Sequence, residues 1–222
     1  MKVALVGAID FNLEHFKSMD FDLVLAVDAG WKSCERAGVK PDIAIGDFDS
    51  LGFTPEGVEV ISFSSVKNET DLELAYLEAH RRGAQELYLY GVLGARLDHT
   101  LATLQVMAAS ALKGLKTFAV APDYAVAALA SGGKLNTLAF DAFDPSLLTG
   151  SYAPHISLMA FLGTVAGLSI EGLAYTLENY DLDSTVSRGL SNEFTGSAAT
   201  IHFEDGVLIA LFPLEALPFA RL

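Results

Sequence analysis

Basic residues are scarce in this sequence of 222 residues. It has 14 lysines and arginines against 28 aspartates and glutamates, so the formal net charge is −14. A chain with this charge repels the phosphate backbone of nucleic acids and anionic membrane surfaces, and we expect neither as a partner. If the substrate carries phosphate groups, local positive charge has to come from elsewhere, and a metal ion is the expected source.

Cysteine is also scarce, and no hydrophobic run is long. Cys34 is the only cysteine, so the chain cannot form an internal disulfide, and no Cys/His cluster has the spacing of a zinc site. The apolar stretch within residues 1–16 is too short to span a bilayer and lacks the features of a secretory signal. These absences predict a soluble protein of a reducing compartment, the cytoplasm.

Two common phosphate-binding motifs are missing as well. The sequence has no GxxxxGK[ST], which excludes a P-loop, and no GxGxxG follows the first predicted strand, which excludes the dinucleotide fingerprint. A nucleotide would therefore have to be bound through other groups.

The first half of the chain alternates short apolar runs with helical patterns. The runs predict strands, and the patterns predict helices at residues 31–38, 70–83 and 97–114. Strands are expected at residues 2–8, 23–29, 42–47, 58–63, 86–91 and 116–121. Strand–helix alternation favours a mostly parallel sheet covered by helices.

The second half shows no long helical pattern. Residues 155–161, 165–177 and 198–212 are strand-like, and Asp205-Gly206 between two β-rich runs indicates a hairpin. We therefore predict an α/β domain with a mostly parallel sheet at residues 1–130, followed by an all-β sandwich domain at residues 131–222.

Five aspartates fall just after predicted strands. They are Asp28, Asp47, Asp49, Asp71 and Asp98. Because the carboxyl ends of parallel strands share one edge of the sheet, these side chains could meet in one crevice. Turn formation and helix capping are the alternatives: Thr70 to Glu73 fits a capping box, and Asp98 could cap a helix beginning at His99.

The Asp47/Asp49 pair needs a further explanation, because its two charges repel each other. No lysine or arginine lies beside the pair in the sequence. A hard cation such as Mg²⁺ accounts for it, since carboxylate oxygens are the ligands that Mg²⁺ prefers, with water and phosphate in the remaining positions.

Positive charge is available in two loops. Arg96 follows two glycines and offers a planar fork for phosphate oxygens, or else it forms an ion pair with a nearby acid. Lys67 could also reach a phosphate, or simply be solvated. Acids for a metal, an arginine and glycine-rich loops suit Mg²⁺-assisted phosphoryl or diphosphoryl transfer.

The order of these motifs resembles the thiamine pyrophosphokinase family over about the whole chain. The motifs are Asp28-Ala29-Gly30, Lys40-Pro41-Asp42, Gly46-Asp47-Phe48-Asp49-Ser50, Thr70-Asp71, Gly94-Ala95-Arg96-Leu97-Asp98-His99 and Ser187-Arg188-Gly189-Leu190-Ser191-Asn192-Glu193-Phe194. The resemblance implies an α/β catalytic domain and a β-sandwich in a homodimer with active sites at the subunit interface. It implies conversion of ATP and thiamine to AMP and thiamine diphosphate, with Mg²⁺ as cofactor.

The resemblance also implies roles for single residues. Asp47, Asp49 and Asp71 correspond to the carboxylates on the metal side. Arg96 and Asp98 correspond to catalytic groups near the transferred diphosphoryl group and the thiamine hydroxyl, with Asp71 shared between the two sets. Because an ordinary aspartate is a weak base, Asp98 is expected to orient the hydroxyl. Substrate-binding residues are expected at Asp28, Lys67, His99, Ser191 and Asn192, the last two near the thiamine pyrimidine.

The chain departs from the family pattern at three positions. Ala29 and Ala95 stand where the family usually has glycine, which is a mild change if the backbone φ stays negative. Asn68 stands where an aspartate is common, so position 68 is not assigned to the metal.

Two other functions are compatible with parts of the pattern. A metal-dependent phosphatase could use Asp47 as its nucleophile, although the chain offers no convincing later Ser/Thr and Lys pair. A non-catalytic thiamine or nucleotide sensor is the other alternative, although a sensor would not need both the metal carboxylates and Asp98.

Overall fold

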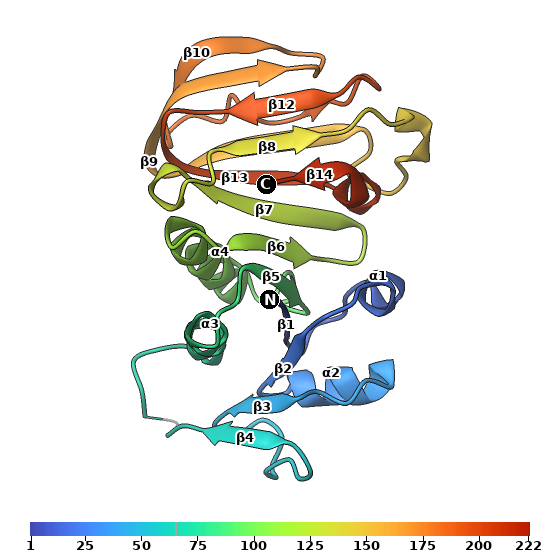
Figure 1. Cartoon of the computed structure of the whole chain (residues 1–222), viewed down its shortest axis with the longest axis vertical. Coiled ribbons are helices and arrows are strands. Elements are labelled where there is room, and N and C mark those ends of the chain that lie inside the picture. The colour runs from blue at the N-terminus through green and yellow to red at the C-terminus, as the bar shows by residue number, and fades with distance from the viewer. Residues whose placement is uncertain (65) are drawn as a thin grey trace. The chain divides into compact units, whose positions relative to one another are not determined.

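The computed structural model describes residues 1–64 and 66–222 (Figure 1). The chain divides into two compact units. The first comprises residues 1–106 and 119–122, and the second comprises residues 107–118 and 123–222. Strand β6 (Lys116–Val120) contributes to both. The domain boundary at residue 130 stays a prediction.

The first unit is built from alternating strands and helices, as the sequence predicts. In chain order they are β1 (Lys2–Val6), α1 (Leu13–Ser18), β2 (Leu23–Val27), α2 (Gly30–Ala37), β3 (Ile43–Gly46), β4 (Glu59–Ser62), α3 (Asp71–Arg81), β5 (Glu86–Tyr90) and α4 (Leu97–Leu112), which continues into the second unit. Helix α1 is the element that the periodicity does not predict. It is short, and its N-cap is Asn12, whose side chain accepts a hydrogen bond from the His15 N–H.

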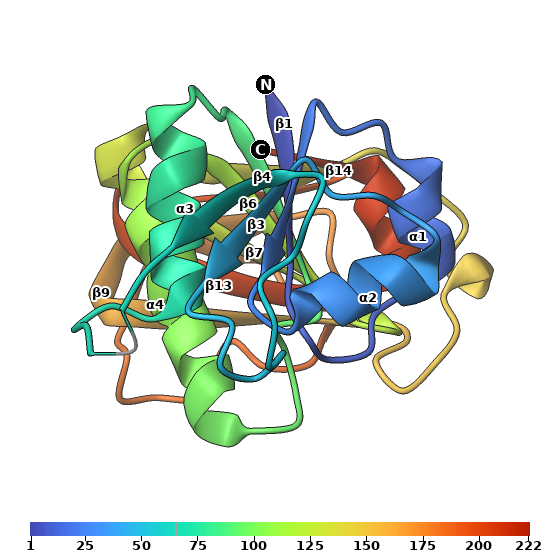
Figure 2. The same ribbon diagram turned by 90° about the horizontal axis from the view of Figure 1, so that it is seen from below.

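The strands of the first unit form a parallel sheet in the order β5-β1-β2-β3-β4. In β1, β2 and β5, four consecutive residues are buried, which is the pattern of strands covered on both faces. Helix α2 packs on β1 and β2, and α3 packs on β1, β2 and β3. Figure 2 shows these two helices on opposite faces of the sheet.

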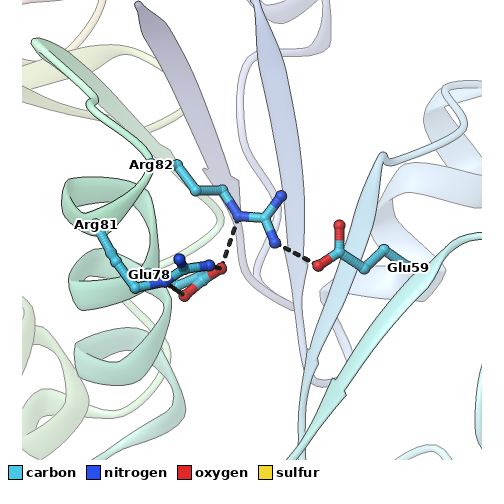
Figure 3. Close-up of polar contacts among 4 residues, drawn as sticks. All are labelled: Glu59, Glu78, Arg81 and Arg82. Carbon is cyan, nitrogen blue, oxygen red and sulfur yellow. Dashed lines mark hydrogen bonds and ion pairs between the residues drawn. The ribbon is translucent and has the colours of Figure 1, made fainter.

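Helix α3 is tied to the edge strand β4 by charged side chains (Figure 3). Glu78 accepts hydrogen bonds from Arg81 and, at 2.6 Å, from the Nε of Arg82. Arg82 also donates to Glu59 of β4. These contacts hold the C-terminal turn of α3 against β4, the strand that precedes it in the chain. Because the helix is rigid, they also help to fix the position of its first turn.

The second unit is rich in β-structure, in agreement with the prediction. Its strands are β7 (Tyr124–Ala130), β8 (Thr137–Phe140), β9 (His155–Glu171), β10 (Leu177–Leu182), β11 (Asn192–Glu193), β12 (Ala199–His202), β13 (Asp205–Pro213) and β14 (Ala220–Arg221), with short 3₁₀ helices at Ser131–Gly133, Pro145–Leu147 and Leu214–Phe219. All strand pairs described within it are antiparallel.

Two details of the second unit differ from expectation. Residues 155–161 and the start of 165–177 belong to one strand, β9, rather than to two. The hairpin predicted at Asp205-Gly206 does not form: β12 pairs with β8 and β9, whereas β13 pairs with β7 and β9. The length of β9 is the reason, because its two ends pair with different neighbours. Within the described part of the chain, no helix has the length and apolar character needed to cross a membrane.

Candidate active site

A pocket of about 490 Å³ opens where the parallel strands of the first unit end. Its walls come from the segments that follow β1, β2, β3, β4 and β5, and from the first turns of α4. The lining residues are Gly7, Ala8, Ile9, Val27, Asp28, Ala29, Ser50, Lys67, Glu69, Thr70, Asp71, Leu72, Gly91, Val92, His99, Ala102 and Thr103. Strand β1 lies between β5 and β2, which is the topological switch point where open α/β sheets bind ligands.

Asp28 enters this pocket in an unusual backbone conformation. Its φ is 46°, in the left-handed region that aspartate tolerates better than most residues, and its N–H donates to the Ile45 carbonyl. A Cβ on Gly46 would lie 3.1 Å from the Asp28 Cα, so glycine permits this close approach. The Oδ1 of Asp28 is buried and has no partner within the described chain, so it is available to a donor or a cation.

The Asp47-Phe48-Asp49 segment forms a tight turn after β3. The Oδ1 of Asp47 accepts a hydrogen bond from the Asp49 N–H at 3.1 Å. Phe48, with φ 59°, is buried against Ala44 and Leu51 and anchors the turn to the core. Asp47 is half-buried and Asp49 is exposed, so the two carboxylates are in different environments.

Lys67 lies between Asp47 and Asp71. Its Nζ is 2.6 Å from the Asp71 Oδ1 and 3.5 Å from the Asp47 Oδ2, and the three side chains are 13%, 25% and 19% exposed, respectively. Burial alone would lower the pKa of Lys67, but the hydrogen bond and charge of Asp71, together with Asp47, raise it above its ordinary value. The structure therefore supplies a cation to both acids from Lys67, which is close to Asp71 in the sequence but distant from Asp47, and Lys67 is not a freely solvated loop lysine.

Asp71 is the first residue of α3, and the capping prediction for its neighbour is confirmed. The Thr70 hydroxyl accepts a hydrogen bond from the Glu73 N–H at 3.1 Å, and Thr70 is the N-cap of the helix. Because Thr70 caps the helix, the Asp71 carboxylate is free of that task and faces Lys67. Thr70 and Asp71 both line the strand-end pocket.

Arg96 and Asp98 form an exposed ion pair at the start of α4. The Arg96 guanidinium meets the carboxylate at 2.6 Å and 3.2 Å, and the His99 N–H donates to the same carboxylate. The hydrogen bond from Arg96 is the largest of the effects that lower the pKa of Asp98 to about 2. A carboxylate with this pKa is a poor proton acceptor at neutral pH, which favours an orienting role. Of the three residues, His99 lines the pocket.

Ala29 and Ala95, which stand where the resemblance implies glycine, differ in backbone conformation. Ala29 has φ −60°, so its methyl group is tolerated without strain. Ala95 has φ 48°, in the left-handed region that disfavours a Cβ. A negative φ, which makes alanine a mild replacement for glycine, is therefore found at position 29 but not at position 95. Alanine at position 95 lowers the stability of the loop that carries Arg96.

Thr100 and Thr103, which belong to none of the motifs described above, hold this loop against α4. The Thr100 hydroxyl accepts a hydrogen bond from the Gly94 N–H, and the Thr103 hydroxyl bonds to the carbonyls of Val92 and His99. The sequence indicates this role only through their i, i+3 spacing near the start of a predicted helix. Threonine hydroxyls in such positions often bond to nearby backbone groups.

The second unit carries a separate apolar pocket of about 370 Å³. Its lining residues are Leu158, Leu168, Ile170, Tyr175, Leu177, Tyr180, Leu182, Arg188, Gly189, Leu190 and Asn192. Asn192 is buried, and its amide bonds to the N–H and C=O of Tyr175 and to the Glu193 N–H. These bonds make Asn192 a support for the pocket wall. Ser191 has φ 58° and is exposed beside it, and its N–H donates to the Ser157 hydroxyl.

A preformed cluster of metal ligands is absent from the described residues, where no three His, Cys, Asp or Glu side chains are grouped to hold an ion. The structure joins Asp47 and Asp71 through Lys67, and it leaves the Asp28 Oδ1 free nearby in the pocket lining. Because Mg²⁺ usually binds through one or two carboxylates plus water and substrate phosphates, this donor set fits Mg²⁺.

Comparisons with known proteins agree on one family. Residues 17–119 match the family model "Thiamin pyrophosphokinase, catalytic domain", and residues 146–208 match "Thiamin pyrophosphokinase, vitamin B1 binding domain", which together cover about three quarters of the chain. A thiamine pyrophosphokinase of Bacillus subtilis is 25% identical over 195 residues, which is 85% of this chain and 86% of that protein.

Solved structures share the fold. The thiamine pyrophosphokinase structure of Bacillus subtilis has a TM-score of 0.80 at 22% identity, over 96% of this chain and 99% of that one. The structure from Geobacillus thermodenitrificans has a TM-score of 0.76 at 23% identity, over 96% and 97%. That from Candida albicans has a TM-score of 0.71 at 15% identity, over 96% and 90%.

Proposed function

Because the chain belongs to the thiamine pyrophosphokinase family, we propose that it is a thiamine diphosphokinase that transfers the diphosphoryl group of ATP to the hydroxyl of thiamine. The observation that carries the proposal is the strand-end pocket at the switch point of the sheet, which Asp28, Lys67 and Asp71 all line. Its position suits a nucleotide, and its acidic residues suit a phosphate-bound cation.

The proposed reaction breaks the bond between the β-phosphorus of ATP and the oxygen that bridges the α- and β-phosphates, and it leaves the bond between that oxygen and the α-phosphorus intact. The thiamine hydroxyl oxygen attacks the β-phosphorus, the oxygen bridging the α- and β-phosphates leaves with AMP, and one proton is released from the hydroxyl. Asp47, Asp49 and Asp71 would hold Mg²⁺, which when bound neutralises charge on the phosphate oxygens. Lys67 and Asp28 would contact the nucleotide or its cation within the pocket lining.

The pair at the start of α4 has a distinct role in this proposal. Arg96 would exchange its bond to Asp98 for the phosphate oxygens, because phosphate offers the same bidentate geometry as a carboxylate. Asp98 would then orient the thiamine hydroxyl, and His99 would contact the substrate from the pocket lining. The exposure of Arg96 and Asp98, 67% and 65%, leaves both accessible to substrate.

We assign the thiamine ring system to the apolar pocket of the second unit. Tyr175 and Tyr180 can face the positive thiazolium ring, since aromatic faces attract cations. Asn192 would shape this pocket, and Ser191 would offer its hydroxyl to the pyrimidine.

The proposal also covers the domain organisation. It includes a sandwich arrangement of the strands in the second unit, and a division into a catalytic domain at residues 1–130 and a thiamine-binding domain at residues 131–222. The matched segments 17–119 and 146–208 lie within these ranges.

The proposal extends to assembly and location. We propose a homodimer with active sites at the subunit interface, which analytical ultracentrifugation would test directly. A cytoplasmic location fits the single, buried and unpaired Cys34.

Asp49 provides the sharpest test of the metal-side acids, because its exposed side chain has no partner that an amide would disturb within the described chain. Asp49→Asn is expected to unfold at the wild-type temperature and to lose about 100-fold or more in thiamine-dependent AMP formation. Asp20→Asn, at another exposed aspartate, is the matched control and should keep full activity. Wild-type turnover by Asp49→Asn would contradict the assignment.

The same assay separates the alternatives. A phosphatase with Asp47 as nucleophile would release inorganic phosphate without thiamine, and the Asp47 carboxylate is already engaged with Asp49 and Lys67. A sensor would bind both substrates without forming AMP.

A further inference from the structure

Lys67 occupies the place that a metal ion would be expected to take between two carboxylates. Its Nζ contacts the Asp71 Oδ1 at 2.6 Å and the Asp47 Oδ2 at 3.5 Å. The three side chains are largely shielded from solvent, and Lys67 and Asp71 both line the strand-end pocket. One ammonium group therefore serves two carboxylates whose charges would otherwise repel each other.

The charge balance of this trio is incomplete. Two carboxylates and one ammonium leave a net charge of −1, whereas two carboxylates and one divalent cation are neutral. Shielded carboxylates that lose their partner are costly, so one cation or another has to remain between them. A lysine and a divalent cation therefore compete for the same oxygens.

Lys67 is suited to leave this position. It lies in the segment between β4 and α3, outside any helix or strand, and its flexible four-carbon stem carries a point charge that can turn toward other oxygens. Lys67 lines the strand-end pocket, so a nucleotide bound there as proposed would offer its phosphate oxygens to the ammonium group. Asp71, in contrast, is fixed at the first position of α3.

We propose that Lys67 is an exchangeable counter-ion: it holds Asp47 and Asp71 together in the nucleotide-free protein, and it releases them to the metal when its ammonium group transfers to the nucleotide phosphates. The inference rests on the proposed function. It implies that the free protein binds divalent cations weakly, and that metal and nucleotide bind cooperatively. Lys67 is thus a positioning residue that suppresses metal binding in the absence of ATP.

The test measures Mn²⁺ binding to the nucleotide-free protein. The concentration of unbound Mn²⁺ is determined from its electron paramagnetic resonance signal. Lys67→Met removes the charge and keeps the stem, and it is expected to bind Mn²⁺ about tenfold more tightly than wild type. Without metal, Lys67→Met should unfold at a lower temperature than wild type, and Mg²⁺ should raise its unfolding temperature more than it raises that of wild type.

Two controls make the result specific. Lys67→Arg retains the charge and should bind Mn²⁺ as weakly as wild type. Lys17→Met, at an exposed lysine of α1, should change nothing. Unchanged or weaker Mn²⁺ binding by Lys67→Met would overturn the inference, as would equal tightening by Lys67→Arg. AMP formation by the same wild-type preparation tests the proposed function separately, so an active enzyme with unchanged Mn²⁺ binding in Lys67→Met would refute this inference alone.

Discussion

Ala95 holds a left-handed backbone conformation in the loop before Arg96, with φ 48°. A Cβ in this region costs about 1–2 kcal/mol, while glycine adds about 0.4–1 kcal/mol of unfolded-state entropy. Ala95→Gly is therefore expected to increase the free energy of unfolding by about 0.5–1 kcal/mol. Urea denaturation measures this change.

The same substitution inside helix α4 is the control. Ala102→Gly should lower the free energy of unfolding by about 1 kcal/mol, because a helix interior penalises glycine. A loss of stability in Ala95→Gly as well would show that the loop does not hold the left-handed conformation in solution.

Some properties of single residues could be predicted from the sequence, and others could not. The strand-end positions of Asp28 and Asp71 follow from strand periodicity, and both line one pocket. The counter-ion of Asp47 could not be identified, because Lys67 is separated from it by a strand and its flanking loops. The left-handed conformation of Ala95 was equally hidden, since a local sequence does not fix φ at a single position. The roles of Asp49, Ser191 and the other site residues remain predictions.

At the scale of elements, the contact between α3 and β4 has a predictable pH dependence. The hydrogen bond from Arg81, supported by Arg82, lowers the pKa of Glu78 from its ordinary value of 4.5 to about 2. Because the folded state holds the charged form more strongly than the unfolded state, this contribution to stability is complete above pH 4.5. It is lost as the pH falls toward 2.

Glu78→Gln is therefore expected to lower the free energy of unfolding by about 1 kcal/mol at pH 7, allowing for solvent screening of the partly exposed pair. The difference from wild type should shrink steadily between pH 4.5 and pH 2. Glu56→Gln, at an exposed glutamate with no partner in the described chain, should match wild type throughout. A difference that stays constant with pH would contradict the role of the Glu78 charge.

Elements with a strong local pattern were the predictable ones. Apart from α1, the strands and helices of the first unit match their predicted positions closely, because runs of buried residues and amphipathic helices carry their own signal. The route of β9 and the separation of β12 from β13 were not predictable. Strand pairing there depends on contacts between residues far apart in sequence, and a local turn signal at Asp205-Gly206 was overridden.

At the scale of the whole molecule, the acidic charge and the family membership point to the same chemistry. A net charge of −14 favours a cationic vitamin and a divalent metal over anionic polymers. Of the two matched segments, the first resembles the catalytic domain of the family and the second resembles its vitamin B1 binding domain. We expect both substrates to react on this chain, with a diphosphoryl group as the group transferred.

Phosphorus NMR of the wild-type protein with ATP, thiamine and Mg²⁺ identifies the group that is transferred. AMP and thiamine diphosphate are expected to accumulate in equal amounts, and omission of thiamine should abolish AMP formation. ADP with thiamine monophosphate, or inorganic phosphate released without thiamine, would show that the protein is not a diphosphokinase.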